Sequence, residues 1–171
     1  MDETFECLGF HKSGKIDAER AIQIQAFHIS VDKPGKEQWL GNGVYFWIEY
    51  GDAVWWPGGY DNPVIVLADI KCQIEKFLDL DDHQGFFSFC DEMKSAFEQF
   101  RKSGLDIELG SQHVIGGASC NYYKFKNGID LIKYSFFDRR SGRPQLCATG
   151  NYILKNIRKA TDFSQIVTGY L

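Results

Sequence analysis

The sequence contains little that would break a compact fold, with only four prolines among 171 residues and no low-complexity stretch. No apolar run approaches the roughly 20 residues of a membrane-spanning helix, so no membrane association is expected. The first residues are acidic and lack the apolar core of a signal peptide, which indicates a cytoplasmic protein. The formal net charge is -4 and no basic run occurs, which argues against a general nucleic-acid binder held by phosphate contacts.

Paired cysteines are also missing. The five cysteines are an odd number, none has CxxC spacing, and the four histidines are not clustered with them. This pattern predicts free, buried thiols in a reducing compartment and no metal site. The acidic residues Asp79, Asp81 and Asp82 do not have the spacing of an EF-hand loop either.

Apolar and aromatic residues are abundant, at 44% and 15% of the chain. A chain of this length and composition is expected to form one packed globular domain over residues 1–171. The aromatic share exceeds what a core needs, so we expect some of these rings to line a ligand cleft.

Apolar periodicity predicts the secondary structure. Helices are expected over 18–25, with Asp17 as N-cap, over 49–56, and over 84–102, whose phenylalanine stripe faces the core or a partner. Extended segments are expected over 5–11, 27–30, 43–47, 63–70, 77–80, 121–125, 128–137 and 145–148, and residues 151–158 fit either a strand or a short helix. Without a βαβ rhythm, this order predicts the α+β class with a mostly antiparallel or mixed sheet.

Three short motifs place polar residues at strand positions. They are His11-Lys12-Ser13, the segment Gly41-Asn42-Gly43-Val44-Tyr45-Phe46, and Arg143-Pro144-Gln145-Leu146-Cys147. The second motif begins like a dinucleotide-binding GxGxxG loop, but position 46 is Phe and no strand-to-helix turn is expected there. A phosphate-binding loop of that type is therefore excluded.

The ordered set of motifs resembles the ADP-ribosyltransferase superfamily, in particular its small bacterial toxin-like members. In that family a strand with His-x-Ser/Thr precedes a helix and a Gly-x-Gly-x-Tyr-Phe strand, and a later strand carries Glu or sometimes Gln. Segments 52–56 and 77–80 also resemble family segments, so the resemblance covers most of the chain. It implies a split, mostly antiparallel or mixed sheet with short flanking helices, NAD as co-substrate and no metal.

The resemblance also implies roles for individual residues. His11 and Ser13 would hydrogen-bond the nicotinamide ribose or carboxamide, and Tyr45 would stack on the cationic nicotinamide ring. Gly41 and Gly43 would let the backbone approach NAD closely, and Phe46 belongs to the same cofactor-binding segment.

The third motif position is Gln145, where the family usually has a glutamate that stabilises the cationic transition state. Glutamine keeps the hydrogen bond but has no charge, which argues against chain-forming activity and allows mono-transfer. His11, Tyr45 and Gln145 are thus the expected catalytic residues. Arg139, Arg140 and Arg143 form a basic cluster nearby that would hold a phosphate group or lie in a solvated loop.

A second alignment uses His28-Ile29-Ser30 as the first motif, but it leaves a segment broken by Pro34-Gly35 where the family has a helix. His11 is therefore favoured. The expected function is mono-ADP-ribosyl transfer to a protein or nucleic-acid acceptor, by a toxin or phage-defence effector with a cognate antitoxin. The alternatives are an NAD- or ADP-ribose-binding module, an NAD glycohydrolase and an unrelated α+β interaction domain.

Overall fold

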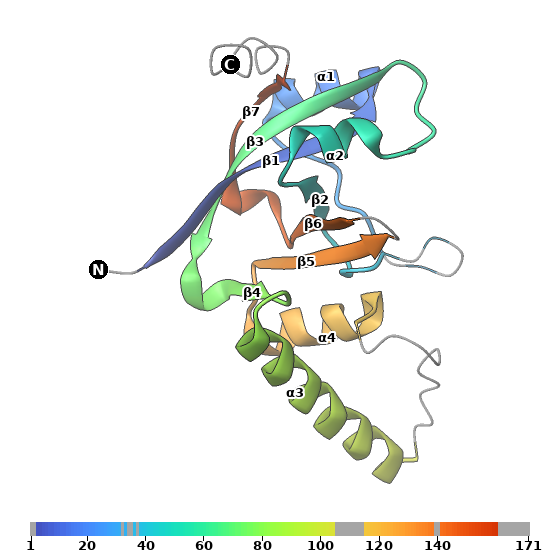
Figure 1. Cartoon of the computed structure of the whole chain (residues 1–171), viewed down its shortest axis with the longest axis vertical. Helices are drawn as coiled ribbons and strands as arrows, with labels where there is room; N and C mark the ends of the chain where they lie inside the picture. The colour runs from blue at the N-terminus through green and yellow to red at the C-terminus, as the bar shows by residue number, and fades with distance from the viewer. Residues whose placement is uncertain are drawn as a thin grey trace.

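The fold combines a central sheet with four helices in the part of the chain that is described (Figure 1). The structure is a computed structural model that describes residues 3–31, 33, 36, 38–104, 115–138 and 141–160. The strands are β1 (Thr4–Gly14), β2 (Val44–Trp47), β3 (Pro63–Gln73), β4 (Phe77–Asp79), β5 (Leu131–Asp138), β6 (Ser141–Ala148) and β7 (Leu154–Lys159). The helices are α1 (Lys15–Ile24), α2 (Tyr50–Trp55), α3 (His83–Lys102) and α4 (Gly117–Asn127), with 3-10 turns at Ile74–Lys76 and Asn151–Ile153.

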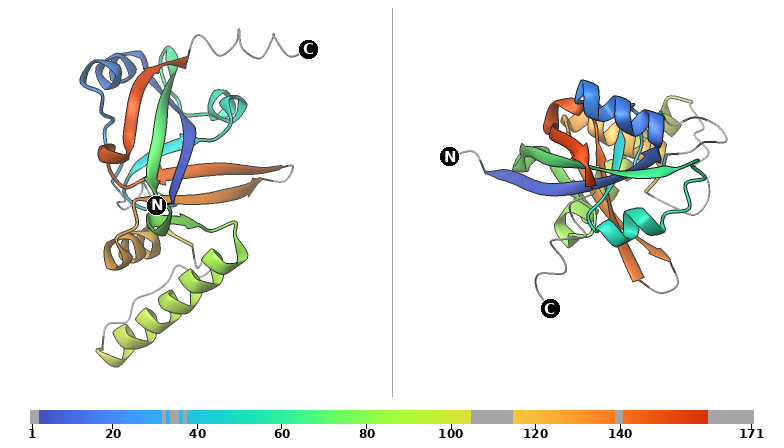
Figure 2. Two further views of the ribbon diagram at one scale, coloured as in Figure 1. Left: turned by 90° about the vertical axis from the view of Figure 1, so that its left-hand side faces the viewer. Right: turned by 90° about the horizontal axis from the view of Figure 1, so that it is seen from above.

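The strands form one seven-stranded sheet in the order β4-β5-β6-β2-β1-β3-β7. All neighbouring strands are antiparallel except β4 and β5, which are parallel, so the predicted α+β class with a mixed sheet is confirmed. β1 pairs with β3 along its whole length, whereas β1 and β2 share the single pair Phe10↔Trp47. The sheet therefore has two halves, the first made of β1, β3 and β7 and the second of β4, β5, β6 and β2. Figure 2 shows β5 and β6 running across the direction of β1 and β3.

Side chains alternate between the two faces of the sheet, as strand geometry requires. Val44 and Phe46 join the core cluster beneath α1. On the other face, Tyr45 packs at the edge of the cluster formed by α3 and α4, while Trp47 packs in the cluster that includes α2. The middle of β2 thus lies between two separate helical covers.

The last two helices stack below β5, with α4 between β5 and the longer α3 (Figure 1). α3 buries Phe89, Met93 and Ala96, so the predicted helix faces the core along this stripe. Asp82 is its N-cap and accepts a hydrogen bond from the Gly85 backbone. None of the described helices is long and apolar enough to cross a membrane.

Two local predictions are wrong. Residues 121–125 are helical rather than extended, because they belong to α4, which buries Ser119, Cys120 and Tyr123 on one side. The first helix begins after Gly14, and Asp17 lies in its first turn instead of capping it. Residues 151–158 are a 3-10 turn followed by β7, which settles the open alternative in favour of a strand. The Pro34-Gly35 turn, Arg139 and Arg140 lie outside the described residues.

Candidate functional site

A cavity of about 360 Å³ lies where the two halves of the sheet meet. The residues that line it come from β1, β2, β6, the end of α2 and two loops. They are His11, Lys12, Ser30, Gln38, Trp39, Tyr45, Trp47, Trp56, Tyr60 and Gln145. The cavity thus brings together His11, Tyr45 and Gln145, the three residues expected to be catalytic.

The imidazole of His11 bridges the gap between β1 and β2. Its Nδ1 lies 2.7 Å from the backbone oxygen of Tyr45. A carbonyl oxygen can only accept, so Nδ1 carries the proton and Nε2 is left as a hydrogen-bond acceptor. Burial lowers the pKa of His11, while the bond to Tyr45 and the charge of Asp17 act in the opposite direction. The ring is therefore neutral at pH 7.

Tyr45 is held by its own turn. The hydroxyl donates to the Gly41 carbonyl at 2.7 Å and accepts from the Leu40 backbone at 2.9 Å. Burial is the main cause that raises the pKa of this phenol. The ring is half-buried, lines the cavity and keeps a fixed orientation because both ends of the side chain are constrained.

Gln145 sits on β6 opposite Trp47 of β2 and Tyr134 of β5. The residue is only 6% exposed, and it lines the cavity. Among the residues that the structure describes, none forms a hydrogen bond with its side-chain amide. Because Gln145 lines the cavity, its amide is available to exchange hydrogen bonds with a ligand bound there.

Indole rings form much of the remaining wall. The ring centroids of Trp47 and Trp56 are 5.4 Å apart, and those of Trp39 and Trp56 are 6.3 Å apart. Lys12 fixes the end of α2 against the cavity, because its Nζ donates to the carbonyls of Val54 at 2.9 Å and Trp56 at 2.6 Å. Sequence reasoning missed these lining residues individually, although the surplus of aromatic residues was the signal that pointed to them.

Two residues expected at the cofactor site lie elsewhere. Ser13 is buried, its hydroxyl donates to the Gly14 carbonyl at 3.2 Å, and it does not line the cavity. Phe46 is fully buried in the core, with its ring 5.3 Å from that of Phe27. Phe46 does not line this cavity, because strand alternation turns it to the opposite face from its neighbours Tyr45 and Trp47.

Gly41 and Gly43 are both required for close packing. Gly41 has φ +78°, and a Cβ at this position would collide with the side chain of Asn121. A Cβ on Gly43 would lie 2.5 Å from the Ala148 carbonyl oxygen. Neither glycine lines the cavity, and protein atoms already fill the space that a side chain would need.

Helix α4 holds this glycine turn in place. The buried Lys124 donates from Nζ to the carbonyls of Leu40 at 3.0 Å and Asn42 at 2.5 Å. The Asn42 backbone donates to Asn121 Oδ1 at 2.6 Å. Because the hydroxyl of Tyr45 is bonded to the same turn, α4 indirectly sets the position of the Tyr45 ring.

Arg143 lies on β6 two residues before the lining residue Gln145. Arg143 forms an ion pair with Asp52, and its guanidinium carbon lies 3.8 Å from the centroid of the Trp55 ring. Arg139 and Arg140 are not among the described residues. His28, the alternative first-motif histidine, is exposed and does not line the cavity, which agrees with the preference for His11.

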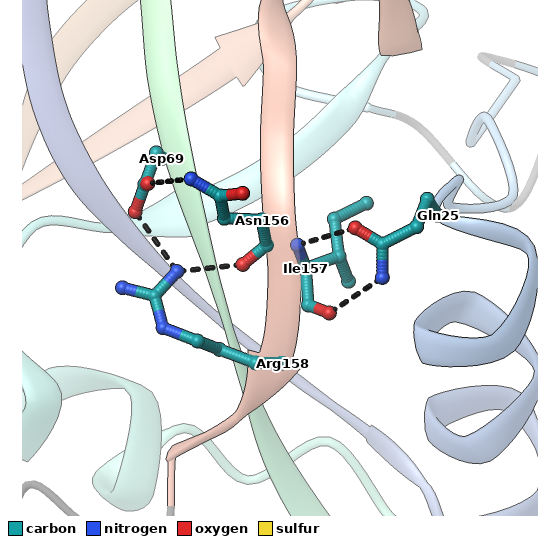
Figure 3. A pocket seen from close by; sticks show the side chains of 5 residues that line it. All are labelled: Gln25, Asp69, Asn156, Ile157 and Arg158. Carbon is teal, nitrogen blue, oxygen red and sulfur yellow. Dashed lines mark hydrogen bonds and ion pairs between the residues drawn. The ribbon is translucent and has the colours of Figure 1, made fainter.

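A second pocket, of about 450 Å³, lies between α1 and β7 and contains none of the predicted site residues (Figure 3). Its polar groups bond to one another. The Gln25 amide joins the Ile157 backbone N–H at 2.9 Å and carbonyl at 2.7 Å, and Asp69 accepts from Asn156 and Arg158. This network fastens the C-terminal end of α1 to β7, and we interpret it as a structural clamp.

Comparisons of the chain with protein families, with curated proteins and with solved structures each return no match.

Proposed function

We propose that the chain is an NAD-dependent mono-ADP-ribosyltransferase. The observation that carries the proposal is that His11 of β1, Tyr45 of β2 and Gln145 of β6 line the same cavity. These residues come from the three motifs that resemble the superfamily. The sheet is also divided into halves that share one residue pair, which agrees with the split sheet implied by the resemblance.

The chemistry of NAD⁺ cleavage fits the groups that line the cavity. Breaking the bond between nicotinamide and ribose produces a sugar with oxocarbenium character. The neutral His11 offers Nε2 as an acceptor for a ribose hydroxyl, and the aromatic walls offer faces for the cationic nicotinamide ring. The carbonyl oxygen of Gln145 is a dipole that can stabilise positive charge, although less strongly than a carboxylate.

The uncharged amide at position 145 also favours a second candidate, a module that binds NAD or ADP-ribose without turnover. The resemblance to toxin-type members extends the first proposal to a toxin or phage-defence effector that is held in check by a cognate antitoxin. An NAD glycohydrolase differs from the transferase only in using water as the acceptor. The transferase and the glycohydrolase make different products and the binding module makes none, so one assay separates the three.

The test incubates the purified full chain with NAD⁺ labelled in its adenylate half, alone and with acceptors, and measures released nicotinamide and transferred label. We expect nicotinamide release that falls about 100-fold or more in His11→Ala and Gln145→Ala, since both would lose contacts to the reacting ribose. Gln145→Glu is expected to raise the rate, because it restores a charge opposite the developing cation.

The matched control is Phe125→Ala, which removes a 91% exposed side chain from α4 and should leave the rate unchanged. Calorimetric binding of NAD⁺ without nicotinamide release would favour the binding module. Neither binding nor release, with the protein folded by circular dichroism, would rule out the proposed function.

A further inference from the structure

Two exposed aromatic residues line the cavity and a third adjoins a lining residue in the chain, and we call these three the aromatic rim. Trp39 and Trp55 are each 49% exposed, and Tyr60 is 41% exposed. Trp39 and Tyr60 line the cavity, while Trp55 precedes the lining residue Trp56. Large rings left half in water beside a cavity are typical of a surface that binds a partner.

Both indoles of the rim are fixed by their neighbours. The Trp39 ring lies 4.7 Å from that of Phe136 on β5, and the Trp55 ring lies against the Arg143 guanidinium. Arg143 is held in turn by Asp52. Flat rings that are already oriented lose little entropy when a planar ligand stacks on them, and stacking needs no particular pattern of hydrogen bonds.

The charge of the cavity restricts the acceptor. Among the described lining residues there is no carboxylate, and the one charged side chain, Lys12, is already bonded to two backbone carbonyls. An arginine or lysine acceptor would bring a cationic group that needs a carboxylate to hold it and to receive its proton. A neutral planar acceptor has no such need.

The Gln145 amide fits a neutral planar acceptor in another way. It offers one oxygen that accepts and one nitrogen that donates, and no described residue hydrogen-bonds to either. With the oxygen directed at the ribose, the nitrogen is left to donate to an acceptor group on the edge of a nucleobase. The amide that lines the cavity and the exposed indoles therefore suit the edge and the faces of the same kind of ligand.

A few basic side chains lie near residues of the aromatic rim. Lys33 and Lys36 are exposed on the segment that leads into Gln38 and Trp39, and Arg143 lies beside Trp55. A few cations match the few phosphates on either side of one presented base. The net charge of -4 disfavours tracking along a long duplex, in which stacked and paired bases would not reach the indoles.

From this arrangement we infer that the acceptor is a nucleobase in an unpaired strand of RNA or DNA, held by the aromatic rim and Gln145. The inference rests on the proposed transferase function. A nitrogen of the base attacks the ribose carbon that carries nicotinamide, so an N–C bond forms as the bond to nicotinamide breaks. Nicotinamide leaves with the bonding electron pair, and the base nitrogen loses its proton to water.

The test supplies labelled NAD⁺ with five acceptors: single-stranded RNA, single-stranded DNA, the two duplexes of these strands, and a protein mixture freed of nucleic acid. We expect label on one or both single strands, removed by nuclease and not by protease. Duplexes should be labelled at least about tenfold less, because their bases are stacked away from the rim. The RNA and DNA arms identify which sugar the site accepts.

The rim itself is tested by the ratio of transferred label to released nicotinamide. Trp55→Ala and Trp39→Ala should lower this ratio about five- to tenfold, the size of one lost stacking contact, and Trp39→Phe should retain most of it. Phe125→Ala removes an even more exposed aromatic residue that does not line the cavity, and it should not change the ratio.

Two results would overturn the inference and leave the proposed function standing. They are nicotinamide release with label on protein alone, and release with no label on any macromolecule. Absence of nicotinamide release under every condition would instead overturn the proposed function, and the inference with it.

Discussion

The tautomer and the charge of the His11 ring could not be predicted from the amino-acid sequence. Its Nδ1 is committed to the Tyr45 carbonyl, and the ring lies between Phe27 and the sheet, with centroids 4.9 Å apart. The surrounding apolar groups disfavour the imidazolium, so the pKa of His11 is lowered in the folded protein. The sequence places a histidine on a strand, but only the packing fixes its tautomer and its charge.

The lowered pKa predicts how stability depends on pH. In the unfolded chain His11 titrates near its ordinary pKa of about 6.5, so below that pH the unfolded state binds more protons than the folded state. The stability that neutral His11 contributes is present above about pH 6.5 and is lost as the pH falls toward the lower, folded pKa. The slope from this one group is at most about 1.4 kcal/mol per pH unit.

Urea unfolding at intervals between pH 8 and pH 5 measures this slope. As the pH is lowered, we expect the free energy of unfolding to decrease less steeply in His11→Gln than in the unaltered protein. The comparison concerns the slopes and not the absolute stabilities. His28→Gln is the matched control, since that side chain is exposed, and it should keep the original slope. An unchanged slope in His11→Gln would mean that the ring is not held neutral.

At the scale of elements, local sequence predicted what local interactions determine. The β-branched run at 63–70 and the apolar stripe of 84–102 became β3 and α3. The segment around Tyr122 and Tyr123 was mistaken for a strand because aromatic residues favour strands in isolation. Packing decides otherwise: Tyr123 lies 5.1 Å from Phe89 of α3, and Gly128 ends α4 in a left-handed conformation with φ +64°.

The missed helix explains why the site could be predicted only in part. The three motif residues were identified from their own segments, but Lys12, Trp39 and Trp56 join the cavity only through long-range contacts. The packing of Gly41 against α4 could not be predicted for the same reason, because Asn121 and Lys124 were not placed on a helix beside this turn. Pairings such as Trp47↔Gln145 depend on strand order, which local periodicity does not encode.

Lys124 provides the test of this support. Lys124→Met keeps much of the side-chain volume but leaves the buried carbonyls of Leu40 and Asn42 without their cationic donor. We expect a loss of about 2–4 kcal/mol in the free energy of unfolding, since each hydrogen bond to a charged group contributes about 1.5–3 kcal/mol. Equilibrium denaturant unfolding measures the change.

Lys126→Met on the same helix is the matched control. Lys126 forms a partly exposed ion pair with Glu92, and such pairs contribute less than about 1 kcal/mol. Equal destabilisation by the two substitutions would show that Lys124 does not hold the turn. A weaker affinity for NAD⁺ in Lys124→Met alone would connect the turn to the site, because the same turn anchors the Tyr45 hydroxyl.

At the scale of the whole molecule, the cavity lies at the least continuous part of the sheet. β1 and β3 are paired through eleven residues each, and β5 and β6 through eight, but the strand pairing between the two halves is limited to Phe10↔Trp47. The His11 side chain adds a hydrogen bond to the Tyr45 carbonyl beside this pair. A ligand that contacts His11 on one side and Gln145 on the other would join the halves. Binding should therefore stabilise the molecule as one unit.

This coupling predicts the response to NAD⁺. A ligand present at 100 times its dissociation constant and bound only by the folded state adds about 2.7 kcal/mol to the free energy of unfolding. For a chain of this size that corresponds to a rise in Tm of about 5–10 °C. We expect this rise in the unaltered protein and in Phe125→Ala, and a much smaller rise in Gln145→Ala, measured by calorimetry at saturating NAD⁺.

Amide hydrogen exchange then separates a ligand that joins the two halves from one that binds either half alone. If NAD⁺ lies in the cavity, the slowing of exchange should appear both in β1, from the first half, and in β6, from the second, because opening either half would release the ligand. Protection confined to one half, or centred on the pocket between α1 and β7, would place NAD⁺ elsewhere and remove the geometric support for a catalytic role of Gln145.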